Sequence, residues 1–561
     1  MKKSLKLFII LLIMATGVDN ALAQIAINPN GNKIAAHVKQ LDKNGNLLGW
    51  YKPEIPGASY THVAKLASEF IKDGTPIDPA SGLPLYYISC CFQGPHMRTQ
   101  EEFDMGVTWE GWMHNPACVW AGLVQSLVLD YRVYSGDASY IDLVRDMLDY
   151  QLENGTTPSD WPWANVPYAS SDPGETIYQG ATRWEHDGMR GDGLHGVEPD
   201  KIGELGIAYL LFYEVTEELK YLDAAIHCAN ALVKYVKDEA AGLDPFTPVN
   251  TNRSPWPFRV NARTGVVIDH YCSNVIEPIR LFDELIRISN RIDIDTAISS
   301  YKNARKYAWD WLYSKNGPMK TSIWNAYFED IPNDPDETNR VQITPMETAR
   351  YLIKNPDMDP DLETNIPALV YWVASAFATD GMDAIKEQTW CYEPMGSHTA
   401  RFASICAMWY EYTGDARFKE MATSYFNLAT YMTDPNGVVR VGPSWPGSWF
   451  SDGYGDYIRH FMEGVRSIPE WAPPGENHLL KSVSVVQDIK YDPKKVTLKT
   501  FDDEGKLTFR LASKPKKVIV GSSGIKENKK GTDTGWTWES LNIGGILKVL
   551  YSGDNTITIE M

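Results

Sequence analysis

The sequence predicts a mainly α-helical protein, in which an (α/α)6 toroid of helical hairpins is followed by a small C-terminal antiparallel β-sandwich. Three observations predict this fold class. Pairs of helical segments repeat along the chain, one unpaired helix stands at each end of the repeat region, and apolar and polar residues alternate near the C-terminus. Repeated helical hairpins form open solenoids or closed toroids. We expect closure because the two end helices can complete each other's pair.

The hairpins share one order of segments. Each begins with a segment that is apolar nearly all round and ends with an amphipathic one; tight turns such as Ser135-Gly136-Asp137 and Thr413-Gly414-Asp415 separate them. The apolar segments are expected to be inner helices and the amphipathic segments outer helices with one wet face. Pairs are predicted over 121–150, 207–235, 270–315, 341–379 and 402–422, with single helices near 60–73 and 453–466.

The composition changes near Pro473-Pro474-Gly475. The residues beyond it alternate with a period of two, as in K-V-T-L-K-T and T-I-T-I-E, which predicts antiparallel strands. The predicted parts are therefore a signal peptide (1–23), an N-terminal extended segment (24–59), the toroid as catalytic domain (60–472) and the β-sandwich domain (473–561).

The N-terminus has the features of an export signal. Three lysines precede the apolar run 7–15, and Ala21-Leu22-Ala23 supplies a small-residue cleavage site. The run is too short to span a bilayer. We expect cleavage near Ala23, a periplasmic location and no membrane insertion.

Charge and cysteine content exclude several classes of partner. The net charge of −19 argues against nucleic acid and anionic membranes. The seven cysteines show no zinc-type spacing, so we predict neither a metal nor a cofactor. The 19 Trp and 30 Tyr residues suit stacking on sugar rings, although a large helical fold also uses aromatic residues as core filler.

The densest group of chemically active residues runs from Arg183 to Gly206. It combines carboxylates, histidines, arginines, a tryptophan and glycines immediately before a predicted helix. Unpaired charge is too costly to bury, so this stretch is not a core segment. The alternative is a solvated acidic loop; the mixture of residue types favours a functional site.

The stretches that precede the inner helices are expected to gather on one face of the toroid. Each carries an aromatic residue beside an ionisable group. The catalytic candidates are Asp187 and Asp269 as the leading pair, then Glu110, Glu185 and His270. The candidates for substrate binding are Trp109, Trp184, Arg190, His195, Tyr271, Asn274, Glu393, His398, Arg401, Asp452 and Tyr457.

This set of residues suits cleavage of a glycosidic bond. One carboxyl with a raised pKa protonates the leaving oxygen, and a second acts as nucleophile or activates water. The arginines favour an anionic sugar such as a uronic acid. Each residue also has a structural interpretation: Asp269 as a helix cap, His270 as a satisfied structural histidine, and the arginines as partners of neighbouring carboxylates.

The repeated hairpins and their G-D turns resemble the six-hairpin glycosidase superfamily over residues 60–470. Together with the export signal and the C-terminal sheet, the layout is similar to periplasmic glycan-degrading enzymes of gut-type bacteria, and among these to the glycoside hydrolase family 154 β-glucuronidases. The W-G-R-x-N-G-W type signature of unsaturated rhamnogalacturonyl hydrolases is absent. The resemblance thus implies a glycoside hydrolase but transfers no catalytic residue.

Two other functions stay open. Polysaccharide lyases of similar build neutralise a uronate carboxylate and remove its C5 proton, and His270, Tyr271, Asn274 and Tyr457 are residue types that suit this β-elimination. A non-catalytic glycan-binding protein would need the aromatic residues but no paired carboxylates. The oligomeric state is not predicted.

Overall fold

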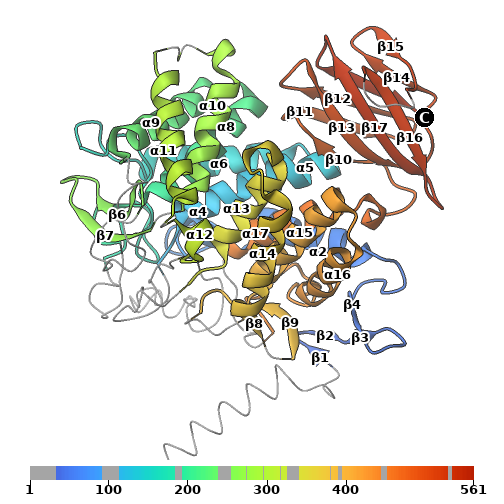
Figure 1. Cartoon of the computed structure of the whole chain (residues 1–561), viewed down its shortest axis with the longest axis horizontal. Helices are drawn as coiled ribbons and strands as arrows, with labels where there is room; N and C mark the ends of the chain where they lie inside the picture. The colour runs from blue at the N-terminus through green and yellow to red at the C-terminus, as the bar shows by residue number, and fades with distance from the viewer. Residues whose placement is uncertain are drawn as a thin grey trace, which may run out of the picture.

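The computed structural model describes residues 33–90, 113–182, 192–237, 254–272, 274–292, 294, 296–315, 317–324, 340–379, 381–389, 394–443, 451–528 and 533–561, with the side chains of 270–272, 451 and 452 excluded. Within these ranges helices predominate as far as Ser467, and strands follow from His478. Figure 1 shows the strands β10 to β18 grouped beside the helical part. The prediction of a helical protein with a β-rich C-terminal region is confirmed.

Inner helices of the described residues contact one another in a cyclic order. They are α4 (Pro116–Leu123) with its continuations η4 (Val124–Tyr131) and α5 (Arg132–Ser135), α8 (Pro199–Thr216), α10 (Ile276–Arg287), α13 (Ile343–Lys354), α15 (Gly396–Thr413) and α17 (Ser451–Ser467). Each packs against the next, and α17 packs against α4. Helix α15 is buried on all sides from Gly396 to Trp409, as expected for an inner helix.

Each inner helix pairs with an outer helix. The outer helices are α6 (Ser139–Asn154), α9 (Leu219–Tyr235), α11 (Ile298–Tyr313), α14 (Leu362–Phe377), α16 (Ala416–Thr430) and α2 (Ala58–Glu69), which continues as η1 (Phe70–Gly74). Helix α2, the first of the repeat region, packs against α17, the last. The two end helices therefore form a pair, as the sequence predicts.

The predicted tight turns have the geometry of helix C-caps. Gly136 and Gly414 adopt φ values of 80° and 74°, the left-handed conformation that glycine reaches without steric cost. The aspartate after Gly414 starts the next helix, because the Oδ1 atom of Asp415 accepts a hydrogen bond of 3.0 Å from the backbone N–H of Arg417. In these G-D turns the glycine ends the first helix of a hairpin, and the second helix follows at once.

The C-terminal strands form two antiparallel sheets. Their orders are β10-β13-β17-β16 and β11-β12-β18-β14-β15. The bounds are β10 (His478–Ser482), β11 (Val486–Asp492), β12 (Lys495–Thr500), β13 (Glu504–Leu511), β14 (Lys517–Val520), β15 (Ser523–Ile525), β16 (Gly535–Ser540), β17 (Gly545–Ser552) and β18 (Thr556–Glu560). Apolar residues of both sheets, such as Val496 and Phe509, share one buried core, separate from the large core of the helical part.

The sheet part contacts the C-terminal ends of inner helices. Buried Arg132 of α5 donates hydrogen bonds to the carbonyl oxygens of Val486, at 2.5 Å, and Gln487, at 3.3 Å. Arg291, just beyond α10, donates to the carbonyl of Phe501. Because outer helices run back between them, the inner helices point the same way. Their N-terminal ends thus lie away from the sheets.

One predicted loop is a strand, and this corrects the sequence interpretation. Residues 263–274 were expected to lead into a helix that starts near 270. Instead β7 (Val267–Cys272) pairs with β6 (Pro257–Asn261), which pairs with β5 (Gly196–Val197), and the helix begins at Ile276. The β-branched run Val266-Val267-Ile268 after the Thr264-Gly265 turn favours a hairpin. Asp269 is therefore a strand residue.

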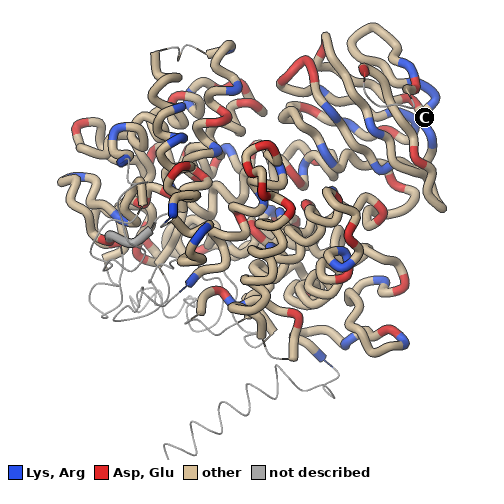
Figure 2. Tube along the Cα trace, in the orientation of Figure 1, with Lys and Arg blue, Asp and Glu red and all other residues tan. Residues whose placement is uncertain are grey.

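Short elements complete the described chain. Two small antiparallel pairs precede α2: β1 (Lys33–Ile34) with β2 (His37–Val38), and β3 (Gln40–Leu41) with β4 (Leu47–Leu48). The others are β8 (Ala378–Thr379), β9 (Met382–Ile385), α12 (Pro318–Thr321), η2 (Leu85–Tyr87), η5 (Ser289–Arg291), η6 (Pro356–Met358) and η7 (Pro469–Trp471). No helix within the described ranges is both long and apolar enough to cross a membrane. Figure 2 shows acidic and basic residues interspersed over both parts.

Candidate active site

Several predicted site residues lie outside the described residues: Glu110, Glu185, Asp187, Trp109, Trp184, Arg190 and Glu393. For three others the structure gives only the backbone. His270 and Tyr271 belong to β7, and Asp452 lies in the first turn of α17. The described side chains are those of Asp269, His195, Asn274, His398, Arg401 and Tyr457.

Asp269 lies in a buried ion-pair cluster. The fully buried Arg259 donates from Nη1 to Oδ2 of Asp269, at 3.2 Å, and from Nε to Oε1 of Glu198, at 2.7 Å. A buried guanidinium needs such partners, because an uncompensated charge is costly. Arg259 of β6 thus links Asp269 of β7 to Glu198, which directly precedes α8.

Asp192 lies in the same region and is fully buried. Its Oδ1 atom accepts hydrogen bonds from the hydroxyl of Ser170 and from the backbone N–H of Ala181. Its Oδ2 atom has no partner among the described residues. Burial raises the pKa of Asp192 to about 7; Arg259 opposes this shift and Glu198 adds to it. The carboxyl is therefore largely protonated below neutral pH.

Replacing Asp192 with asparagine is expected to stabilise the protein at alkaline pH. The folded-state pKa lies above the ordinary 3.8, so wild type loses stability as pH rises through about 7, whereas an amide has no charge to bury. At about 1.4 kcal/mol per pKa unit the effect is a few kcal/mol. Thermal unfolding of both proteins between pH 5 and pH 9 measures it. A difference in unfolding temperature that stays constant with pH would contradict the assignment.

The remaining described candidates have different surroundings. His195 packs its ring edge-on against Trp161, with 4.6 Å between ring centroids, and its backbone is left-handed. The Oδ1 atom of Asn274 accepts a hydrogen bond from the N–H of Ile276 at the start of α10. Tyr457 is fully buried, and its hydroxyl donates to the carbonyl of Ala429 at 2.7 Å. Tyr457 thus packs in the core of the helical part.

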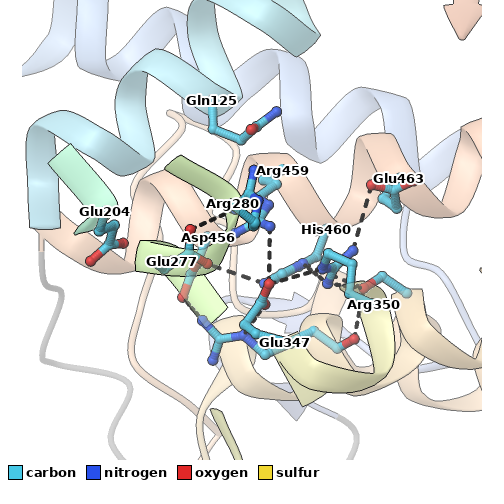
Figure 3. A network of polar contacts seen from close by, with 12 residues as sticks. Gln125, Glu204, Glu277, Arg280, Glu347, Arg350, Asp456, Arg459, His460 and Glu463 are labelled. Atoms are coloured by element: carbon cyan, nitrogen blue, oxygen red, sulfur yellow. Dashed lines mark hydrogen bonds and ion pairs between the residues drawn. The ribbon is translucent and has the colours of Figure 1, made fainter. Parts of the chain in front are cut away.

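His398 and Arg401 belong to a charged network on the inner helices. Figure 3 shows other members of this network, among them Glu347, Arg350 and His460. Its members come from α13, α15 and α17, and we call it the inner-helix network: Glu347, Arg350, His398, Arg401, Asp456, Arg459, His460 and Glu463. Arg401 donates from Nη1 to Nδ1 of His398 at 2.8 Å. The predicted pair is thus brought together, inside the helical part.

Glu347 is the centre of this network. Its carboxylate accepts three hydrogen bonds: from Nε of Arg350 at 3.1 Å, from Nε of Arg401 at 3.2 Å and from Nη2 of Arg459 at 3.0 Å. Burial alone would raise the pKa of Glu347. The guanidiniums of Arg459, Arg350 and Arg401 outweigh this effect and hold the pKa well below its usual range.

A pocket adjoins the network. Its polar lining consists of Gln125, Glu204, Glu277, Arg280, Asp456 and Arg459, and its volume of about 30 Å³ has room for water. Figure 3 shows these side chains on helices from distant parts of the sequence. The π-helical segment η4 supplies Val124, Gln125 and Leu129; such segments are frequent at functional sites.

The three acidic residues of the pocket differ in how far their side chains are exposed to solvent. The side chains of Glu204 and Asp456 are 29% and 26% exposed, whereas that of Glu277 is 8% exposed and pairs with Arg280 at 2.7 Å. Asp456 accepts a hydrogen bond from Nη2 of Arg401 and is an ion-paired carboxylate. Burial within the protein raises the pKa of Glu204 to about 7; Lys201 opposes the shift, while Glu277 and Asp456 add to it. Two accessible carboxyls thus have opposite electrostatic surroundings.

The charged residues of α17 form a pattern that indicates this site, although the predicted site residues came from aromatic-rich stretches before the helices. On α17 the polar residues Asp456, Arg459, His460, Glu463 and Arg466 recur at helical spacing, so they share one face. A helix of the inner layer that keeps a charged stripe directs the stripe toward other inner helices. Among the described residues, no group of three or more His, Cys, Asp or Glu side chains is arranged to hold a metal ion.

No protein-family model matches the chain, and no curated protein matches it. Solved structures with partial similarity include a cellobiose 2-epimerase from Spirochaeta thermophila (10% identity, 73% of this chain and 97% of that chain, TM-score 0.48). They also include a GH76 α-mannanase from Bacteroides thetaiotaomicron (12% identity, 72% and 95%, TM-score 0.46) and a sugar epimerase from a ruminal bacterium (12% identity, 72% and 99%, TM-score 0.45). Similarity of this degree identifies no function.

Proposed function

We propose that the chain is a glycoside hydrolase in which Glu204 is the general acid and Asp456 the ionised carboxylate. The observation that supports this most is the pocket itself, where two accessible carboxyls lie in opposite surroundings. Glycosidases need one carboxyl that keeps its proton near neutral pH and one that does not. Burial, together with the nearby acids Glu277 and Asp456, raises the pKa of Glu204, whereas Asp456 forms an ion pair with Arg401.

The proposed reaction follows from these two roles. Glu204 gives its proton to the glycosidic oxygen as the bond from that oxygen to the anomeric carbon breaks. Asp456 either attacks the anomeric carbon, to be displaced by water in a second step, or takes a proton from a water that attacks directly. Both routes add one water molecule across the bond. The pocket has room for such a water.

The arginines of the pocket favour an anionic sugar. Arg280 donates one hydrogen bond to Glu277, and Arg459 donates one to Glu347. A guanidinium has five N–H donors, so both arginines keep donors for a ligand. A uronic acid, whose carboxylate pairs with a guanidinium, is the substrate class we propose.

The architecture proposed for this enzyme is a closed (α/α)6 toroid with a C-terminal β-sandwich, made by an exported protein. The cyclic order of contacts among inner helices supports closure. The shared core of the two antiparallel sheets supports the sandwich. The export signal of the sequence fits an enzyme that acts on polysaccharide outside the cytoplasm.

Product analysis tests the reaction class. The protein without residues 1–23 is incubated with a panel of uronic-acid glycans, and the products are measured by mass and by ultraviolet absorbance. Hydrolysis adds the mass of water to the products and creates no new chromophore. An unsaturated uronide would identify the β-eliminating lyase instead, and binding without any product would identify a glycan-binding protein.

A further inference from the structure

Asp456 is part of a closed ring of polar contacts. Arg401 donates from Nη2 to Oδ2 of Asp456 and from Nε to Oε1 of Glu347. The Nε atom of Arg350 donates to Oε2 of Glu347, and its Nη2 atom lies 3.0 Å from Nδ1 of His460. The Nε2 atom of His460 faces back to Oδ1 of Asp456 at 3.6 Å. The ring thus returns to the carboxylate that lines the pocket.

The arginine fixes the tautomer of His460. A guanidinium can only donate, so Nδ1 of His460 accepts from Arg350, and the proton of the neutral imidazole is on Nε2. Burial, together with the charges of Arg350, Arg401 and Arg459, lowers the pKa of His460 well below its usual value, so the ring stays neutral. The Nε2–H group is buried and has no hydrogen-bond partner within the described residues. An unpaired buried donor destabilises the fold, which calls for a reason to keep it.

We propose that His460 is a positioning residue, which directs its Nε2–H group at Oδ1 of Asp456 and keeps that carboxylate aimed into the pocket. The inference rests on the proposed function of Asp456. Arg401 hydrogen-bonds the other oxygen of Asp456, whereas the Nε2–H group of His460 faces Oδ1 at 3.6 Å and attracts it without a hydrogen bond, so the two residues act on the carboxylate from two sides. Such outer partners commonly change activity by about 10–100-fold when they are lost, although they do not touch the substrate.

The other charges around Asp456 do not supply this restraint. Arg459 lies on the same helix but hydrogen-bonds Glu347, and Arg280 of α10 hydrogen-bonds Glu277. Across the pocket, Glu204 of α8 is a carboxyl, whose interaction with Asp456 raises the pKa of Glu204. Among the described residues, His460 thus brings a neutral donor to 3.6 Å from Oδ1 of Asp456.

Two amide variants test the roles of the two nitrogen atoms of His460 separately. His460→Gln places an amide N–H near the position of Nε2 and keeps a donor toward Asp456. His460→Asn places its amide oxygen near the position of Nδ1, keeps an acceptor for Arg350 and removes that donor. We expect His460→Asn to lower kcat about 10-fold or more with KM nearly unchanged. His460→Gln retains most of the wild-type rate.

The outcomes distinguish this inference from the proposed function. Equal losses in both variants would indicate a packing role, and wild-type behaviour of His460→Asn would also overturn the inference. If wild type shows no hydrolysis of any glycan, the proposed function fails instead. The tautomer is tested separately, by nitrogen-15 NMR of histidine-labelled protein. A His460 signal for Nδ1–H, or for a charged ring near pH 7, would overturn the inference whatever the activity.

Discussion

Replacing Glu204 with glutamine is expected to lower kcat by roughly 10²–10⁴-fold, the range that general acid catalysis contributes. Glutamine has nearly the same volume and keeps one acceptor oxygen for Cys118 or Lys201, but it has no acidic proton to give. The fold and KM should therefore change little. Steady-state kinetics on a hydrolysed uronic-acid glycan, with the unfolding temperature measured beside it, tests the expectation.

The pH dependence gives an independent test of the same residue. Glu204 acts only while protonated, and its pKa of about 7 predicts that kcat/KM of wild type falls as pH rises through about 7. The residual activity of Glu204→Gln should lack this alkaline limb. Asp200→Asn is the control: Asp200 lies on the same helix and its pKa is also raised by burial, but it does not line the pocket. Because the charge of Asp200 adds to the raised pKa of Glu204, the control should keep its activity and its alkaline limb should move to somewhat lower pH. Full loss of activity in the control, or an unchanged alkaline limb in Glu204→Gln, would place the acid elsewhere.

The sequence was sufficient for the fold because its signals are local and repeated. Gly136 and Gly414 mark hairpin turns, and the apolar run of α15 identifies a helix buried on all sides. The hairpin β6–β7 was missed because the residues around Asp269 are as polar as a loop, and a partner for them becomes visible only when Arg259 is seen in space.

The candidate site was predicted less well, for a physical reason. Inner helices were expected to be apolar, and Glu204, although it lies within the noted stretch Arg183–Gly206, was not among the predicted site residues. Buried charge is costly alone but acceptable when partners converge from other helices, and such convergence does not follow from one segment. Arg350 and Arg401 are separated by 51 positions in the sequence yet bind one carboxylate, that of Glu347. His398 and Arg401 were candidates because they belong to a polar stretch that was expected to precede an inner helix; in the structure both lie in the first two turns of α15.

Replacing Glu347 with glutamine should produce the largest loss of stability, about 3–5 kcal/mol, the usual cost of removing one partner of a buried ion pair. The amide leaves the guanidiniums of Arg350, Arg401 and Arg459 without their shared countercharge. Asp310→Asn is the control, because its pair with Lys306 is largely exposed and surface pairs contribute about 0–1 kcal/mol. Denaturant unfolding near pH 7 compares the three proteins, and a Glu347→Gln variant as stable as the control would show that the guanidiniums find other partners.

The same variant should change how stability depends on pH. The pKa of Glu347 is lowered in the folded protein, so its stabilising effect is complete above the ordinary value of 4.5 and is lost as pH falls below it. The difference in stability between wild type and Glu347→Gln is therefore expected to be greatest near neutral pH and to shrink below pH 4.5. The opposite pH dependence is expected for Asp192→Asn, because the pKa of Asp192 is raised. The stability differences of the two variants from wild type therefore change in separate pH ranges. A difference for Glu347→Gln that persists unchanged in acid would mean that lost packing, and not lost charge, causes the destabilisation.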